Sequence, residues 1–375
     1  MSSDETTRFY LDRLVQDAKV PGIQYLAVGP NQTVFNYAGG WADIKGRRPL
    51  HSSTTLSAYS VSKTITAVAV LQLAETQNVM LDKPIDDYLE FQPYGPDVTV
   101  RQLLSHSSGI PNPIPLRWVH KVATHDTFDE RSELTRILLK HPKLSSFPGT
   151  KYIYSNIGYW LLGQIVEHVS GKLFSSYVTD HIFHPLGILP QELGYKITDD
   201  GNHAKGYLEM YSLMNFTKRF LIDTELIGAY EGKWLHIKNH YANGPAFGGL
   251  IGNATGLGKF LKDQLRPHSV LFNDSTRQLF YASQCNKRGA SIPMTLGWHI
   301  GMVGSTRFFY KEGLGGGFHA MMRIYPGSEI ATIVMTNATS FDVGKFLDMV
   351  DPKYFVNSIS KCNSTELVRG QAAVA

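Results

Sequence analysis

Hydrophobic residues follow two different periods along the chain, and the change of period divides the chain into regions. At residues 5–19 apolar side chains recur at helical spacing. Residues 23–30 and 33–43 then have the composition of two strands, with a turn between them at residues 30–31. From about residue 60 to residue 200 the helical period dominates, so this region is predicted to be mostly helical.

Helices fill the middle of the chain, and strands return near the C-terminus. The predicted helices span residues 62–79, 130–141 and 159–171. Gly171 has the position of a C-cap. Segments rich in aromatic and β-branched residues predict strands at 294–303, 306–313, 318–326 and 329–337. Residues 341–350 are predicted to form the last helix.

Strands at both ends with helices between them predict an α+β fold, in which one discontinuous domain receives an insertion. Residues 1–57 and 225–375 make the discontinuous domain, where the terminal strands form one antiparallel sheet flanked by the first and last helices. Residues 58–224 make a mainly helical domain. Small-molecule sites commonly lie in the cleft between two such domains, and we expect the site there.

Composition excludes several kinds of protein. The formal net charge is only +4, and no run of four basic residues forms the stripe that nucleic-acid binding requires. Two cysteines are too few for a disulfide framework or a Cys-rich metal site. The N-terminal sequence does not read as a signal peptide, and no apolar run approaches 18 residues. We therefore expect a cytoplasmic protein that does not cross a membrane.

The segment Ser-x-x-Lys occurs twice, at residues 60–63 and 358–361. On a helix this spacing puts a hydroxyl and an amine on the same face, one turn apart. Burial lowers the pKa of the amine, which can then take the hydroxyl proton, and the helix N-terminus favours the developing negative charge. A buried helix would thus make the serine a candidate nucleophile.

The first copy has the surroundings that this chemistry needs. The positions from Ile65 to Ala74 are apolar nearly all round the helix, which is typical of a buried helix. A polar tail follows Lys361 near the C-terminus, where chains fray. We therefore predict that Ser60 is the nucleophile and that Ser358 lies at the surface.

Two more short patterns also occur twice. Tyr-x-Asn occurs at residues 154–156 and 241–243, and Lys-x-Gly occurs at residues 287–289 and 311–313. The copy at 311–313 ends an aromatic strand and leads into a glycine-rich turn, whereas the copy at 287–289 lies in a loop-like run.

Together these patterns resemble the serine β-lactamases and penicillin-binding proteins, which combine Ser-x-x-Lys with Tyr-x-Asn or Ser-x-Asn and with Lys-Thr-Gly. The Tyr-x-Asn form is that of the class C β-lactamases and the related family VIII carboxylesterases. The sequence segments at residues 99–111 and 148–178 also resemble the family, and the resemblance spans roughly residues 20–340. It selects the copies at 154–156 and 311–313, and implies the β-lactamase/transpeptidase-like fold.

The resemblance also implies roles for single residues. Ser60 would attack a substrate carbonyl and form an acyl-enzyme, with Lys63 and Tyr154 sharing the work of the general base. Asn156 would orient Lys63 and the substrate. Lys311 would place positive charge near Tyr154 and favour its phenolate.

An oxyanion hole completes the implied scheme. Its donors would be the backbone N–H groups of Ser60 and Leu314. Water would then deacylate the enzyme. The scheme needs no metal and no organic cofactor.

The third motif departs from the family, because Glu312 stands between Lys311 and Gly313 where relatives have threonine. In penicillin-binding relatives the middle hydroxyl helps to bind a substrate carboxylate. A glutamate there repels such a carboxylate or pairs with Lys311, so small neutral esters or amine-bearing substrates are favoured. The preferred hypothesis is a carboxylesterase-like serine hydrolase, with a D-amino-acid amidase or aminopeptidase and a class C-type β-lactamase as alternatives.

Two hypotheses belong to other classes. An α/β-hydrolase needs a Gly-x-Ser-x-Gly elbow and strands that alternate with helices. The chain has no such pentapeptide, and its predicted strands do not alternate with helices. A homologue that keeps the fold but only binds its ligand is compatible with glutamate at position 312.

For most of the conspicuous histidines we expect a structural role or an exposed position rather than catalysis or metal binding. We expect His106 to hydrogen-bond the Ser-Ser-Gly turn that follows it. His181 and His184 share a helix face with no third ligand evident, which predicts an exposed face rather than a metal site. His319 follows the glycine-rich turn, and faces either the cleft or the sheet.

Overall fold

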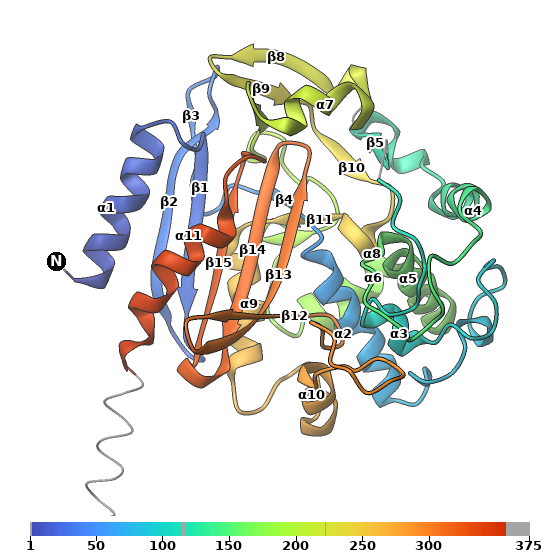
Figure 1. The fold of residues 1–375 in the computed structure, drawn as a ribbon. Helices are drawn as coiled ribbons and strands as arrows, with labels where there is room; N and C mark the ends of the chain where they lie inside the picture. Colours follow the sequence, from blue (N-terminus) through green and yellow to red (C-terminus); the bar gives the residue numbers. More distant parts are fainter. Residues whose placement is uncertain (1, 115–117, 222, 358–375) are drawn as a thin grey trace, which may run out of the picture.

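The N- and C-terminal strands pair in one antiparallel sheet (Figure 1). This computed structural model describes residues 2–114, 118–221 and 223–357. The sheet has seven strands, in the order β12 (His299–Val303), β13 (Thr306–Gly315), β14 (Phe318–Tyr325), β15 (Ile330–Thr336), β1 (Gly22–Val28), β2 (Thr33–Asp43) and β3 (Arg48–Pro49). Strands β1, β14 and β15 are buried along their whole length, as expected when both faces of a sheet are covered. The predicted α+β class and the antiparallel sheet are confirmed.

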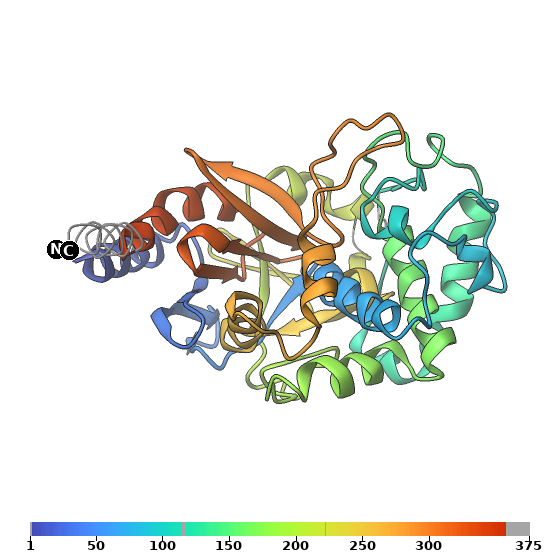
Figure 2. The ribbon, with the colours of Figure 1, turned by 90° about the horizontal axis from the view of Figure 1, so that it is seen from below.

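The first and last helices cover one face of this sheet, as the sequence predicts (Figures 1 and 2). They are α1 (Ser3–Gln16) and α11 (Val343–Val350). Leu11 and Leu14 of α1 share a buried hydrophobic cluster with Phe346 and Leu347 of α11. A capping box between Ser2 and the residue three positions into the helix fixes the start of α1.

Helix α9 (Ala254–Leu265) packs on the opposite face, against β1 and β15. A Cβ at Gly258 would lie only 2.4 Å from Cδ2 of Leu26 in β1, so glycine lets the helix approach the strand closely. The second face of the sheet is therefore turned toward the helices.

The helical region is built around α2 (Ser62–Glu75), whose residues from Ser62 to Leu71 are all buried. It contacts α5 (Asn156–Ser170) and α8 (Pro245–Gly248), which explains why its sequence is apolar on every side. It ends four residues earlier than predicted. The other helices of this region are α3 (Val100–Leu104), α4 (Glu130–Lys140), α6 (Phe174–Val178), the π-helix η3 (Thr179–Phe183) and α10 (Asp274–Tyr281).

The remaining helices are short. They are α7 (Leu213–Leu221) and the 3₁₀ segments η1 (Ile85–Asp87), η2 (Val122–Thr127), η4 (Thr224–Leu226), η5 (Pro326–Ser328) and η6 (Asp351–Asn357). No helix in the described ranges combines the length and the apolar composition needed to cross a membrane.

Three small sheets were not predicted. Their strands are β4 (Leu56–Tyr59), β11 (Leu250–Gly252) and β6 (Leu193–Gly194); β7 (Gly206–Glu209), β9 (Trp234–Ile237) and β8 (Ile227–Glu231); and β10 (His240–Ala242) with β5 (Val119–Lys121). These strands have two to five residues, too few for a period to show in the sequence. Most of them pair with partners far away in the chain.

One predicted strand is shorter than expected. Only His299–Val303 of the aromatic segment at 294–303 forms β12. The side chains of Met294, Leu296 and Trp298 are buried, but these residues lie outside the strand. The hydrophobicity of residues 294–298 therefore reflects packing in the core rather than pairing within a β-sheet.

Candidate active site

A sharp turn between β4 and α2 presents Ser60. Tyr59 has a left-handed backbone with φ 44°, and the helix proper begins at Ser62, two residues after Ser60. The Ser62 hydroxyl donates to the Tyr59 carbonyl at 2.6 Å and accepts the Leu250 N–H at 2.9 Å. The turn is therefore held from both sides, and Ser60 remains partly exposed.

The Ser60 hydroxyl lies between an amine and a phenol. Lys63 Nζ is 2.8 Å from Ser60 Oγ, and the Tyr154 hydroxyl also lies 2.8 Å from Ser60 Oγ. Lys63 Nζ donates a further hydrogen bond of 2.6 Å to the Phe247 carbonyl of α8. The structure thus brings together the three side chains that the sequence proposed as the reacting group.

Burial and a like charge lower the pKa of Lys63. Its side chain is 0% exposed, and removal from water shifts the pKa well below the ordinary 10.5, with the nearby Lys311 as the second cause. A neutral amine keeps a lone pair that can accept a proton. Lys63 is therefore suited to remove the Ser60 proton.

Burial shifts the pKa of Tyr154 in the opposite direction. It raises the pKa of this phenol well above the usual 10, and its hydrogen bond to Ser60 only partly offsets the effect. We expected Lys311 to favour the phenolate, and Lys311 Nζ does lie 5.3 Å from the centre of the Tyr154 ring. Desolvation nevertheless wins, so that Tyr154 rests as a protonated donor.

Lys311 in β13 is the second buried lysine of the site. Its side chain is 0% exposed, and within the described part of the chain its Nζ has no hydrogen-bond partner. Desolvation lowers its pKa to about 7. An unpaired buried amine is destabilising, which points to a role other than holding the fold.

We expect Lys311→Met to stabilise the protein by about 1–3 kcal/mol, because methionine has a size similar to that of lysine and removes the unsatisfied buried amine. The measurement is the midpoint of urea unfolding at pH 7. The exposed Lys345→Met should change stability by less than about 0.5 kcal/mol. A destabilised Lys311→Met would show that the amine has a stabilising partner.

The pH dependence of unfolding gives a second readout of the same change. Between pH 7 and 10.5 the unfolded chain binds a proton at Lys311 that the folded chain does not bind. The stability of the native protein should therefore rise with pH across this window. The rise should be smaller in Lys311→Met, and an equal rise would contradict the lowered pKa.

Gly313 lets β13 approach the turn that carries Ser60. A Cβ at this position would lie 1.9 Å from the Ala58 carbonyl oxygen and 2.9 Å from the Ser60 nitrogen, both of them backbone atoms. Strand β12 pairs with β13 only as far as Tyr310, so the segment from Lys311 onward is open toward β4. Glycine is thus required for this contact.

Replacing Gly313 by alanine should separate β13 from the Ser60 turn and lower kcat/KM about 100-fold, the effect of a misplacement near 1 Å. Steady-state hydrolysis of an ester substrate measures it. Gly327→Ala is the control, because a Cβ there meets no atom within 4 Å. Equal activity of both variants would contradict the tight contact.

Leu314 follows Gly313 on the same open segment, opposite His319 of β14. Its side chain is exposed, so the backbone rather than the side chain can serve the site. That its N–H joins the Ser60 N–H as an oxyanion donor stays a prediction.

Asn156 begins α5 but does not hydrogen-bond to Lys63 as we expected. Its backbone N–H donates to Asn112 Oδ1 at 3.0 Å. Among the described residues the buried Asn156 Oδ1 has no hydrogen-bond partner. The amide oxygen is thus left over for a substrate donor or a rearranged Lys63.

Glu312 pairs with His319 rather than with Lys311. Its Oε1 lies 2.6 Å from His319 Nε2, and His319 Nδ1 lies 2.7 Å from the Phe341 carbonyl. Because side chains alternate along a strand, Glu312 points away from the buried Lys311, and its side chain is 42% exposed. The alternative in which Glu312 neutralises Lys311 is therefore wrong.

Two histidines pack around Tyr154, an arrangement that the sequence does not predict. The His106 ring lies 4.4 Å from the Tyr154 ring, and its Nδ1 accepts the Ser155 N–H at 3.1 Å. Its Nε2 has no hydrogen-bond partner among the described residues, so His106 holds the Tyr154 loop and not the Ser-Ser-Gly turn that we expected. The His299 ring lies 6.2 Å from Tyr154, and its Nε2 is 3.0 Å from the Tyr152 hydroxyl. No pattern in the sequence singles out His299, whereas His106 lay in a segment already noted.

The rejected copies of the motifs lie elsewhere. The Tyr241 hydroxyl accepts the Ile197 N–H at 3.1 Å, and Lys287 belongs to a loop whose backbone contacts Gly149. Residues 358–361 lie outside the described residues. His181 and His184 are exposed, and in the described ranges no three His, Cys, Asp or Glu side chains are grouped to hold a metal ion.

Comparison with known proteins extends the resemblance over most of the chain. A family model described as Beta-lactamase matches residues 9–348. Penicillin-binding protein 4* of Bacillus subtilis (strain 168) is 30% identical over 171 residues, which cover 44% of this chain and 36% of that protein. The chain therefore spans about a third of the length of this curated relative.

Solved structures show the same fold. The D-amino acid amidase from Ochrobactrum anthropi SV3 superposes with a TM-score of 0.78 at 20% identity, covering 96% of this chain and 100% of that chain. EstCE1, a hydrolase with promiscuous acyltransferase activity, gives a TM-score of 0.69 at 19% identity, covering 94% and 98%. At these identities the likeness establishes the fold alone.

Proposed function

The chain belongs to the beta-lactamase family, and from this premise we propose that it is a serine hydrolase that works through an acyl-enzyme on Ser60. One observation carries the proposal: both Lys63 Nζ and the Tyr154 hydroxyl lie 2.8 Å from Ser60 Oγ. A hydroxyl with a neutral amine on one side and a phenol donor on the other can be deprotonated and can pass a proton to a leaving group.

In the acylation step, Lys63 accepts the Ser60 proton while Oγ bonds to the substrate carbonyl carbon. The carbonyl electron pair moves to oxygen, where the N–H groups of Ser60 and Leu314 would stabilise it. Collapse of this intermediate breaks the bond to the leaving group, to which Tyr154 donates its proton. Transfer of a proton from Lys63 to Tyr154 restores both groups.

Deacylation follows with water as the nucleophile. Lys63 removes a proton from the water as its oxygen attacks the acyl carbon, and this proton passes to Ser60 Oγ when the ester bond breaks and the acid is released. No group beyond the chain and water enters the balance.

We favour small neutral carboxylic esters as substrates, with amine-bearing amides as the alternative. The charge of Glu312 supports this choice, since it is close enough to contribute to the raised pKa of Tyr154 and would repel a carboxylate near the site. The fold shared with EstCE1 and with the D-amino acid amidase is compatible with either substrate.

A paired assay separates these substrates. Wild type and Ser60→Ala are each given p-nitrophenyl butyrate, a chromogenic cephalosporin and a D-alanine anilide. We expect the ester to be hydrolysed fastest, and only by wild type. Fast cephalosporin turnover without ester hydrolysis would favour a class C-type β-lactamase, and anilide turnover alone would favour the amidase.

Glu312→Gln tests the charge argument directly. The pairing with His319 offsets part of the Glu312 charge, so its removal should be worth at most about 1 kcal/mol. It should raise kcat/KM for the anionic cephalosporin by up to about fivefold and lower it similarly for the D-alanine anilide. The neutral ester should change little. Glu90→Gln, an exposed charge elsewhere, is the control, and equal ratios in both variants would remove Glu312 from substrate selection.

A homologue that binds without catalysis is the competing hypothesis. It predicts that a fluorophosphonate probe leaves the protein unlabelled, whereas an activated Ser60 reacts.

A further inference from the structure

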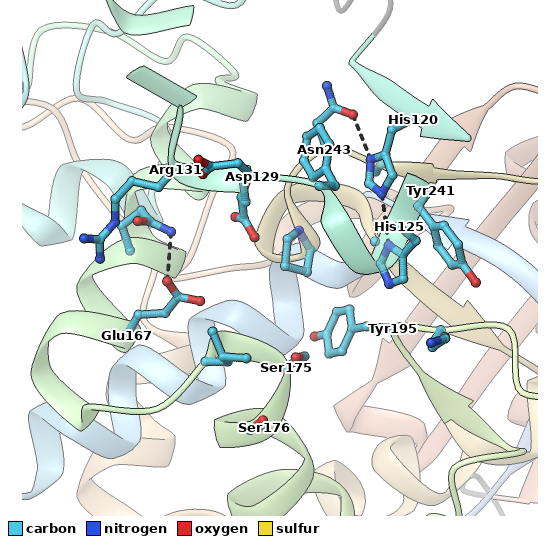
Figure 3. A pocket seen from close by; sticks show the side chains of 18 of the residues that line it. His120, His125, Asp129, Arg131, Glu167, Ser175, Ser176, Tyr195, Tyr241 and Asn243 are labelled. Carbon is cyan, nitrogen blue, oxygen red and sulfur yellow. Dashed lines mark hydrogen bonds between the residues drawn. The ribbon is translucent and has the colours of Figure 1, made fainter. Parts of the chain in front are cut away.

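The rejected Tyr-x-Asn copy at residues 241–243 lines a pocket of about 830 Å³ (Figure 3). Its walls come from η2, the start of α4, the middle of α5, α6 and β10. Ser60, Lys63, Tyr154 and Lys311 are not among its lining residues. The pocket is thus a second concave site, and its use is independent of the proposed function.

Two histidines form a fixed relay on one wall (Figure 3). Asn243 Nδ2 donates to Glu133, which leaves Oδ1 to accept from His120 Nδ1 at 3.0 Å. His120 Nε2 lies 3.0 Å from His125 Nδ1, and burial lowers the pKa of both rings, so both are neutral. His120 Nε2 therefore accepts from His125 Nδ1–H, and His125 Nε2 is left as an acceptor.

Two carboxylates on the other wall have no cationic partner within the described part of the chain. Glu130 accepts a hydrogen bond of 2.7 Å from Trp160 Nε1, and Glu167 accepts from Gln164 and from the Phe174 N–H. Neither forms an ion pair within 4 Å with a described residue. Burial and the neighbouring Glu167 raise the pKa of Glu130 to about 8, the mark of an uncompensated pair.

The other charges of the lining do not balance this pair. Lys196 is 2.8 Å from Asp126, and Asp180 is 2.7 Å from Lys172. Asp129 caps α4, and Arg131 is the remaining lining cation. The pocket therefore keeps an excess of negative charge.

Rings and aliphatic groups supply an apolar body to the same pocket. Tyr241 stacks on His125 at 3.9 Å, and Leu173 and Pro245 also line the space. The Tyr195 ring lies between the two walls, and its shielded hydroxyl has no hydrogen-bond partner among the described residues (Figure 3). A ligand here meets acceptors and π faces together.

We propose that this pocket binds a small organic ammonium ion with an apolar or aromatic body. The ammonium group lies with Glu167, which balances its charge, and donates a hydrogen bond to the carboxyl of Glu130, which is mostly protonated at pH 7.5. The body of the ligand lies against Tyr195 and Tyr241. His125 Nε2 accepts a further N–H or O–H from the ligand.

The test uses benzylamine, a cation at pH 7.5, and its neutral analogue benzyl alcohol, in calorimetric titrations of the whole chain. Wild type should bind one benzylamine with a Kd of about 1 mM and benzyl alcohol at least about tenfold more weakly. The double variant Glu130→Gln, Glu167→Gln should lose about tenfold or more in affinity for benzylamine. Glu90→Gln should bind like wild type.

A second variant guards against misfolding of the first. Ser176→Trp changes an exposed residue of the rim and narrows the pocket, so it should weaken benzylamine binding while p-nitrophenyl butyrate hydrolysis is unchanged. The proposal is overturned by no saturable binding to wild type, by equal binding of amine and alcohol, or by unchanged affinity in either pocket variant.

Discussion

Ser60→Ala is expected to lower kcat for ester hydrolysis by about 10⁴-fold or more, the scale seen when a serine nucleophile is removed. The reason is geometric: the hydroxyl is the atom on which Lys63 and Tyr154 converge, and no other group occupies its place in the turn. The measurement is steady-state turnover of p-nitrophenyl butyrate with the variant purified free of wild type.

Ser358→Ala is the control from the second Ser-x-x-Lys copy, and it should keep kcat near wild type. Thermal unfolding of Ser60→Ala should be close to wild type, since Ser60 is partly exposed. Substantial turnover in Ser60→Ala, or its loss in Ser358→Ala, would contradict the assignment of the nucleophile.

Lys63→Met is expected to lower kcat/KM by about 10²–10⁴-fold, the usual contribution of a general base. Methionine keeps most of the side-chain volume in the buried helix but cannot accept a proton or bond to the Phe247 carbonyl. Lys287→Met, in the loop copy of Lys-x-Gly, should have no comparable effect. Equal activity of Lys63→Met and wild type would exclude Lys63 as the base.

The pH profile tests the same residue without mutation. Because burial lowers the pKa of Lys63 well below 10.5, the acidic limb of kcat/KM should lie well below pH 10.5. An acidic limb near pH 10.5, the ordinary value for lysine, would show that the amine rests in its charged form.

The sequence predicted the long elements and the reacting residues, because each has a local signature. The apolar period of α2, the strands of the terminal sheet and the helix that ends at the left-handed Gly171 are written in consecutive residues. The choice of Ser60 over Ser358 likewise rested on the residues that follow each serine.

What the sequence could not predict depends on contacts between distant segments. The Phe247 carbonyl that holds Lys63 and the ring of His299 beside Tyr154 come from parts of the chain with no motif of their own. The pairing of Glu312 with His319 depends on which face of β13 is buried. The positive charge of Lys311 alone predicts a lowered pKa for Tyr154, whereas burial, the larger effect, raises it.

The acyl-enzyme claim is tested most directly by intact-mass spectrometry of the protein after reaction with a fluorophosphonate, followed by peptide mapping. We predict one phosphonyl adduct per chain, on the peptide that contains Ser60, and no adduct in Ser60→Ala. An unmodified wild-type protein, or an adduct on a different residue, would contradict it.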